Sequence, residues 1–279
     1  MKTRIIVDST ADLMTEMKSR VHTVPLTVLF GDKEFIDGVT IDHKTFYEKL
    51  IESDVLPTTS QATPIAFMKE FEKVKQTGEA AVVITLASKL SGTYQSAVIA
   101  AQEYENIYVV DSASVAMGSG ILVELALRLV DEGRSAEQIA EILEQEKKKI
   151  VVVALIDTLE YLKKGGRISK TVAFAGGILN IKPVLSVVDG EINMLGKARG
   201  SKMGNNLLIQ EIDKAGGVDF TKPVLLGYSG ISDALLQKYI EDSRHIWEGN
   251  LQEIRYTTVG SVIGTHAGPG AVAVAFYKK

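Results

Sequence analysis

Short aliphatic runs alternate with amphipathic stretches along the first half of the chain. Between the runs, apolar residues recur at helical spacing, as at Phe67, Phe71 and Val74. Such alternation predicts a doubly wound, mainly parallel sheet with helices on both faces. Four runs have the length and composition of strands: Ile5 to Val7, Val24 to Phe30, Ala81 to Leu86 and Ile107 to Val110.

A different pattern follows in the second half. Val184 to Val188 and Glu191 to Leu195 flank Asp189-Gly190, a dipeptide typical of two-residue β-hairpins. Antiparallel and crossover elements are mixed here, which indicates an α+β domain. Because 279 residues is long for one compact domain, we expect two, an α/β domain over 1–160 and an α+β domain over 161–279.

Composition excludes several functional classes. Lys and Arg number 31 against 35 Asp and Glu, and this mild net charge of −4 argues against a nucleic-acid partner. The chain has no cysteine, which excludes disulfides and thiolate chemistry. The opening residues do not have the pattern of a signal peptide, and no apolar run reaches the roughly 20 residues of a membrane span. We therefore expect a cytoplasmic protein.

A polar loop follows one predicted strand directly. Ser88 to Thr93 comes after Ala81 to Leu86 and opens a helix, at the carboxyl edge of a parallel sheet where ligands collect. Free N–H groups there favour an anion, and Ser91 and Thr59 could each donate a hydrogen bond to a carboxylate or phosphate. Alternatively, Ser91 simply caps the helix.

A glycine-rich stretch near the C-terminus surrounds one histidine. Gly264 to Gly270 contains three glycines and a proline, a composition that predicts a shaped turn near a ligand. His266 in this stretch could bind a carboxylate or transfer a proton, although a lone loop histidine is more often structural. Asp12 superficially resembles part of a phosphatase or metal loop, but we expect it to start the following helix.

Seven segments, found in order along the whole chain, resemble the DegV family. They are Asp8 to Leu13, Thr59 to Gln61, Leu90 to Ala97, Asp111-Ser112, Thr158 to Ile168, Ile181 to Pro183 and His266 to Gly270. The resemblance implies a protein that holds one long-chain fatty acid in a tunnel between its domains, with no cofactor and no metal. It further implies a non-catalytic subunit of bacterial fatty acid kinase. A separate ATP-binding subunit would phosphorylate the carboxyl group, and the acyl-phosphate would feed phospholipid synthesis.

Site residues follow from the same resemblance. Thr59, Ser91 and His266 would contact the fatty acid carboxyl group, and Gly92 would add a backbone contact. Arg199 and Lys202 would dock the kinase subunit, although solvated surface charge is about as common an explanation. Transient contact with a membrane surface is also expected.

The groups that hold the head group, the lining of the tunnel and the class of protein are left open by the sequence. We hypothesise that neutral hydroxyls, rather than an arginine, hold the head group, because a bidentate guanidinium would blunt the attack of the carboxylate on a phosphate. Ala173 to Leu179 and the surroundings of Ile263 are either tunnel lining or plain core.

The alternatives to a carrier are a hydrolase or acyltransferase using Ser91 with His266, and a lipid-sensing regulatory protein.

Overall fold

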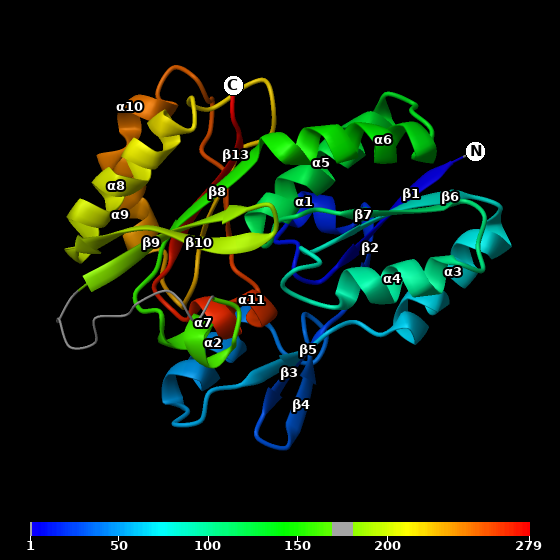
Figure 1. The fold of residues 1–279 in the computed structure, drawn as a ribbon, viewed down its shortest axis with the longest axis horizontal. Helices are drawn as coiled ribbons and strands as arrows, with labels where there is room; N and C mark the ends of the chain where they lie inside the picture. Colours follow the sequence, from blue (N-terminus) through cyan, green and yellow to red (C-terminus); the bar gives the residue numbers. More distant parts are fainter. Residues whose placement is uncertain (1, 169–180) are drawn as a thin grey trace.

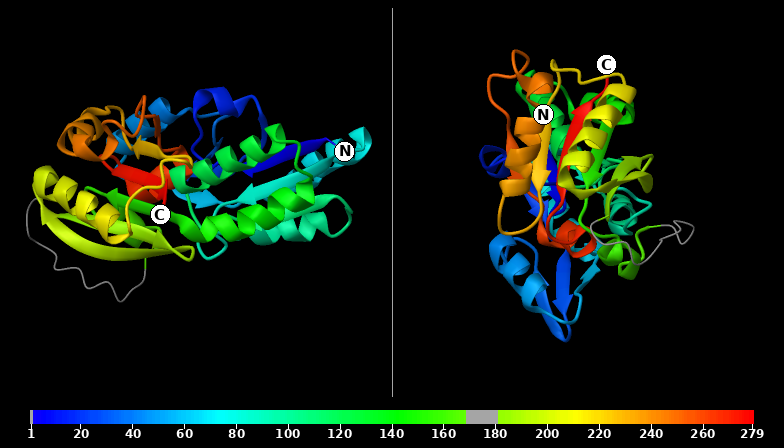
Figure 2. Two further views of the ribbon diagram at one scale, coloured as in Figure 1. Left: turned by 90° about the horizontal axis from the view of Figure 1, so that it is seen from above. Right: turned by 90° about the vertical axis from the view of Figure 1, so that its left-hand side faces the viewer.

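The computed structural model describes residues 2–168 and 181–279 and contains three sheets in two lobes. Figure 1 shows a four-stranded sheet on the right, a six-stranded sheet on the left and a small three-stranded sheet below them. The two larger sheets lie side by side along the longest dimension of the molecule, as the view from above in Figure 2 shows. No helix among the described residues is both long and apolar enough to cross a bilayer.

The four-stranded sheet is parallel, as the sequence pattern predicts. Its order is β2-β1-β6-β7. The strands alternate sides, so that Ile5 and Val82 pack into one core while Ile6 and Val83 pack into another. The strands are β1 (Thr3–Asp8), β2 (Val21–Val24), β6 (Ala80–Thr85) and β7 (Ile107–Asp111).

Helices cover both faces of this sheet, as expected. One face carries α1 (Thr15–Lys18), α5 (Met117–Asp131) and α6 (Ala136–Glu146), which continues into a 3-10 turn, η1 (Lys147–Lys149). The other face carries α2 (His43–Glu52), α3 (Pro64–Thr77) and α4 (Thr93–Ala101).

A small antiparallel sheet, in the order β4-β3-β5, was not predicted. The run Val24 to Phe30 was expected to be one strand, but Pro25 interrupts it, and the chain leaves β2 to join a second sheet. Proline has no N–H to give to a ladder, which explains the break at this position. The strands are β3 (Thr27–Phe30), β4 (Lys33–Ile36) and β5 (Thr58–Ser60).

The six-stranded sheet is mixed, in agreement with the α+β expectation. Its order is β10-β9-β8-β13-β11-β12, antiparallel except for the β11–β12 pair. The predicted hairpin is present, with Asp189 and Gly190 both at positive φ. The strands are β8 (Ile150–Leu155), β9 (Ile181–Val188), β10 (Glu191–Arg199), β11 (Leu225–Tyr228), β12 (Tyr256–Thr258) and β13 (Val272–Tyr277).

The six-stranded sheet begins with β8, which pairs with β9 and β13, so its first residue is Ile150. The division into domains 1–160 and 161–279 stays a prediction. The outer face of the six-stranded sheet packs against α8 (Gly200–Lys214), α9 (Ala234–Asp242) and α10 (Arg244–Trp247).

The inner face of the six-stranded sheet turns toward the other lobe. There α5 contacts strands of both large sheets, and one continuous core joins Ile5 and Val82 to Val152 and Ala275. Two short helices, α7 (Glu160–Lys164) and α11 (Ser261–Ala267), lie beside each other below this core (Figure 1).

Candidate functional site

A cavity of about 390 Å³ lies between the two lobes. Its volume is within the usual range for sites that hold small organic ligands. Most of its wall is apolar and comes from both halves of the chain. The apolar lining includes Leu86, Val115, Met117, Val152, Ala154, Leu162, Leu185, Val187, Ile192, Ile263 and Ala273.

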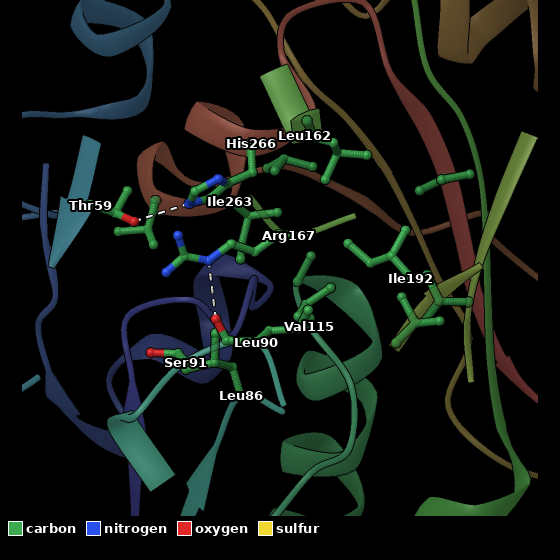
Figure 3. Close-up of a pocket in the computed structure, with 18 of the residues that line it drawn as sticks. Thr59, Leu86, Leu90, Ser91, Val115, Leu162, Arg167, Ile192, Ile263 and His266 are labelled. Carbon is green, nitrogen blue, oxygen red and sulfur yellow. Dashed lines mark hydrogen bonds between the residues drawn. The ribbon is translucent and has the colours of Figure 1, made fainter. Parts of the chain in front are cut away.

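Side chains that point to the same face of β8 and β9 form part of this wall. Val152 and Ala154 on β8 and Leu185 and Val187 on β9 are two residues apart on their strands, so each pair points to the same face. In Figure 3, Ile192 on β10 lies at one end of the drawn residues and Thr59 at the other. The cavity therefore has an aliphatic end and a polar end.

Thr59 and His266 meet at the polar end. The Thr59 hydroxyl oxygen lies 3.0 Å from Nε2 of His266, although 207 positions separate the two residues (Figure 3). β5 supplies Thr59 and α11 supplies His266. The expected shaped turn is thus a helix through Ala267, and the positive-φ turn begins only at Gly268.

The imidazole of His266 is held in its neutral form. Burial, assisted by the nearby positive charge of Arg167, lowers the pKa of His266 from 6.5 to about 4. Its Nδ1 is buried and has no hydrogen-bond partner among the described residues. Nδ1 lies directly against the backbone of Gly165, where a Cβ atom would come within 2.2 Å of it. Glycine at 165 is therefore required for the ring to occupy this position.

Ser91 lies at the same end, on the loop before α4. Its Oγ is 2.9 Å from the Thr93 hydroxyl and accepts a hydrogen bond from the Thr93 N–H at 3.3 Å. Ser91 therefore bonds to the first residue of α4 and also lines the cavity, while Gly92 occupies the N-cap position. Anion binding by Ser91 stays a prediction. Gly92 follows with the Gln61 amide against it, so close that a Cβ would lie 2.2 Å from Oε1.

Arg167 is a cavity residue that the sequence analysis did not select. It comes just after the two glycines that follow α7, and its guanidinium lies between the Thr59–His266 pair and Ser91 (Figure 3). Nε donates to the Leu90 carbonyl at 3.2 Å and Nη1 donates to the Gly165 carbonyl at 2.7 Å. Since its partners are backbone carbonyls of a distant loop and of its own turn, no side-chain pattern could have identified it.

The four residues predicted to contact the head group, Thr59, Ser91, Gly92 and His266, all line this one cavity. Arg199 and Lys202 do not line it. They are exposed where β10 passes into α8. Ile263 lines the cavity, whereas Ala173 to Leu179 lies outside the described residues.

Ser91 and His266 do not form a nucleophile–base pair in this arrangement. The hydrogen bonds of Ser91 go to Thr93, and Nε2 of His266 contacts Thr59. Within residues 2–168 and 181–279, no acidic side chain bonds to Nδ1 to orient the ring. A serine hydrolase needs both of these contacts. The polar end is instead suited to binding an anion with two hydroxyls, an imidazole and a guanidinium.

Comparisons with known proteins identify the family of this chain. A family model described as "Uncharacterised protein, DegV family" matches residues 2–279. A DegV domain-containing protein of Caldanaerobacter subterraneus is 36% identical over 284 residues, covering 100% of this chain and 99% of that protein. A Thermus thermophilus DegV family structure, described by its fatty acid binding, is 31% identical with a TM-score of 0.89, and the match covers 100% of both chains. Bacillus subtilis DegV, described as a fatty acid binding protein, is 30% identical with a TM-score of 0.85 over 100% of both chains. The chain belongs to the DegV family.

Proposed function

We propose that this protein binds one long-chain fatty acid and presents its carboxyl group to a separate ATP-dependent kinase subunit, which forms the acyl-phosphate for phospholipid synthesis. The observation that carries the proposal is an apolar cavity whose polar groups gather at one end, around Thr59, Ser91 and His266. Two similar proteins, from Thermus thermophilus and Bacillus subtilis, are described as binding fatty acids.

The hydrocarbon tail supplies the binding energy in this proposal. Each buried methylene contributes roughly 0.8 kcal/mol, and the strands on both sides of the cavity offer aliphatic side chains. The tail extends from the hydroxyl groups toward Val152, Leu185 and Ile192. The head group then needs only orientation, not strong binding.

The head group is oriented by a short chain of hydrogen bonds. With its proton on Nε2, neutral His266 donates to the Thr59 oxygen, which leaves the Thr59 hydroxyl hydrogen for a carboxylate oxygen. On the other side, our proposal takes the Thr93 hydroxyl as the donor in its bond with the Ser91 hydroxyl, which leaves the Ser91 hydrogen free for the carboxylate. Two neutral donors would thus hold the carboxylate.

Arg167 changes the hypothesis that hydroxyls act alone. Its guanidinium is near enough to His266 to lower the pKa of that ring, so it is also near the proposed head group. Nε donates to the Leu90 carbonyl and one Nη1 hydrogen donates to the Gly165 carbonyl, so the side-on pair of Nε and Nη2 cannot bind a carboxylate as a fork. In our proposal, Arg167 attracts the anionic head and the more highly charged acyl-phosphate through its charge and its remaining Nη hydrogens.

The partner subunit would approach the exposed parts of this protein. Arg199 and Lys202 remain our proposed docking residues, and both are exposed. The chain itself supplies no catalytic residue in this proposal. Since the partner uses ATP, the proposal also places the protein in the cytoplasm, where brief contact with the membrane surface would allow the lipid to be exchanged.

Mass spectrometry of an organic extract of the purified protein tests fatty acid binding. We expect one long-chain fatty acid per chain. Absence of lipid from both freshly purified and fatty-acid-incubated protein would contradict the proposal. A covalent acyl group on Ser91 would favour the hydrolase or acyltransferase instead.

Phosphorylation with a DegV-type kinase subunit and ATP tests presentation of the head group. Ser91→Ala and Thr59→Ala should lower the rate at least about tenfold, since each removes one charge-assisted hydrogen bond, while fatty acid remains bound. Ser88→Ala is the matched control, an exposed serine on the same loop that does not line the cavity. Unchanged rates in both variants would remove these hydroxyls from the site, and lack of phosphorylation of the unaltered protein would favour a lipid sensor.

A further inference from the structure

The first turn of α11 is held by two buried aspartates that are distant in sequence. Oδ1 of Asp12 accepts a hydrogen bond from the Gly260 N–H at 2.9 Å. The Asp37 carboxylate accepts one from the Ser261 hydroxyl. The two aspartates are only 4% and 3% exposed. Asp12 was predicted to start the helix that follows it, but α1 begins only at Thr15. The Asp12 carboxylate instead bonds to the start of a helix near the other end of the chain.

The last turn of the same helix carries His266. From Ser261 to His266 the helix rises about 8 Å at 1.5 Å per residue. Asp37 directly follows β4 and Thr59 lies on β5, and both strands pair with β3. The helix is therefore bonded at both ends to the same three-stranded sheet, through Asp37 at its start and Thr59 at its end.

Between these two ends, α11 packs closely against α2. A Cβ on Gly264 would lie 2.5 Å from the Tyr47 hydroxyl and 2.8 Å from the Phe46 ring, so backbone and rings are in direct contact. The Tyr47 hydroxyl donates to the Val259 carbonyl at 3.0 Å, just before the helix starts. The start of the helix cannot move without displacing its other end, because a single short helix has no internal joint.

We infer that Asp12 and Asp37 are positioning residues that set the place of the His266 ring against Thr59, through α11. The part of this inference that concerns the lipid head group rests on the proposed function. The part that concerns the His266 ring stands on the contacts of the protein alone.

The surroundings of the two aspartates support a role beyond packing. Each has a second carboxylate oxygen that is buried and has no hydrogen-bond partner in the part of the chain that the structure describes. Both aspartates line a separate pocket of about 220 Å³. We call this the acidic pocket; it is lined by Asp8, Asp12, Asp37, Lys18 and His43, among others. Unpartnered buried carboxylate oxygens are costly, so apolar residues would fill this space with less penalty if packing were the only requirement. Within residues 2–168 and 181–279, no three His, Asp or Glu side chains are arranged to hold a metal ion.

The pKa of the Asp12 carboxyl group agrees with this description. Burial raises the pKa of Asp12 well above its usual value, and the neighbouring Asp37 and Asp8 carboxylates raise it further. The Gly260 N–H and the Lys18 ammonium oppose this. An amide in place of the carboxyl group would keep the acceptor for Gly260 and avoid the charge.

The test is a nuclear magnetic resonance titration of the His266 ring in ligand-free protein, with the ring signals assigned by their loss in His266→Gln. Asp12→Leu removes the acceptor for Gly260. We expect the ring to become better solvated and its pKa to rise from about 4 by at least about one unit toward 6.5. Asp12→Asn keeps a side-chain oxygen that accepts the hydrogen bond from the Gly260 N–H. The pKa of the His266 ring should therefore stay at its value in the unaltered protein, in contrast to Asp12→Leu.

Two further variants keep the test decisive. If Asp12→Leu does not fold, Ser261→Ala can replace it. This variant removes the hydroxyl that donates a hydrogen bond to Asp37 and keeps both carboxylates. It should also raise the pKa of the His266 ring. Ser135→Ala is the control, because it removes the side-chain cap of α6 without altering any residue of the cavity or the acidic pocket. A folded Asp12→Leu or Ser261→Ala protein with an unchanged His266 pKa would overturn the inference. Because the ring is measured without lipid, failure of fatty acid binding would contradict the proposed function and leave this result intact.

Discussion

The two ends of α11 lie in opposite chemical environments. At its start, the acidic pocket places the Asp12 carboxyl group against the Gly260 N–H. At its end, neutral His266 lies against Thr59 at the polar end of the mainly apolar cavity between the lobes. Burial raises the pKa of Asp12 and lowers the pKa of His266, so the same physical cause drives an acid and a base toward their neutral forms. One short helix thus connects a polar region that bonds to its first turn with the mainly apolar cavity that we propose as the ligand site.

The largest expected effect comes from placing an acid in the apolar region. Leu185→Asp would put a charge on the cavity wall, where no hydrogen-bond partner compensates its desolvation. We expect the affinity for long-chain fatty acid to fall at least about 100-fold, as measured by fluorescent fatty acid displacement. Leu195→Asp is the control, because Leu195 is 38% exposed on β10 and does not line the cavity. Equal affinity in both variants would show that the tail does not lie along β9.

The contributions of His266 and Asp12 to the free energy of unfolding should change with pH in opposite directions. The folded pKa of His266, about 4, is below its unfolded value of 6.5, so between these values the unfolded chain binds more protons. The free energy of unfolding is therefore lost as pH falls from about 6.5 to about 4, by up to about 3 kcal/mol from this group. Urea unfolding at several pH values should show a smaller loss in His266→Gln.

Asp12 should give the opposite pH dependence of stability to His266. Its folded pKa is raised, so its contribution to stability is lost as pH rises from its unfolded value through the folded one. Asp12→Asn should remove this loss and become more stable relative to the parent as pH rises. A pH dependence of the same sign for His266→Gln and Asp12→Asn would contradict the opposite charge preferences of the two ends.

A smaller effect is expected from filling the cavity. Ala154 on β8 faces the cavity, and Ala154→Leu adds three carbons to the wall. We expect the extracted fatty acids to become shorter by about two to four carbons, because each methylene that no longer fits gives up roughly 0.8 kcal/mol. Mass spectrometry of the extract measures this. An unchanged length distribution would place the tail away from β8.

The smallest effect is expected at the surface between the lobes. Lys89 and Glu191 form an ion pair of 3.1 Å between the loop after β6 and the β9–β10 hairpin, with both side chains more than half exposed. Such pairs contribute less than about 1 kcal/mol. Lys89→Met should leave both the unfolding free energy and fatty acid affinity nearly unchanged. A large loss of affinity would show that this surface contact, rather than the cavity wall, retains the ligand.

Local patterns in the sequence predicted much of the fold. Strand and helix spacing indicated the parallel sheet, and Asp189-Gly190 indicated the hairpin. The position of Ser91 followed from a strand that ends directly before a helix. The three-stranded sheet was missed because Pro25 divides one apolar run between two sheets.

Contacts between distant segments could not be derived from spacing. Thr59 and His266 are 207 positions apart, and only the family resemblance grouped them. Arg167 bonds to backbone carbonyls, which every residue has. Asp12 was assigned to its neighbouring helix because a local rule favours acids at a helix start, whereas the fold uses the same preference at α11.

Helix α5 finally constrains how a ligand can leave. It packs against strands of both large sheets, and all but a few of its residues are buried in the core that the lobes share. A hinge motion that separates the lobes would remove α5 from one of the two large sheets and expose much of its apolar surface to water. If a fatty acid binds in this cavity as we propose, we expect its release to follow local rearrangement at the cavity rim rather than rotation of one lobe against the other.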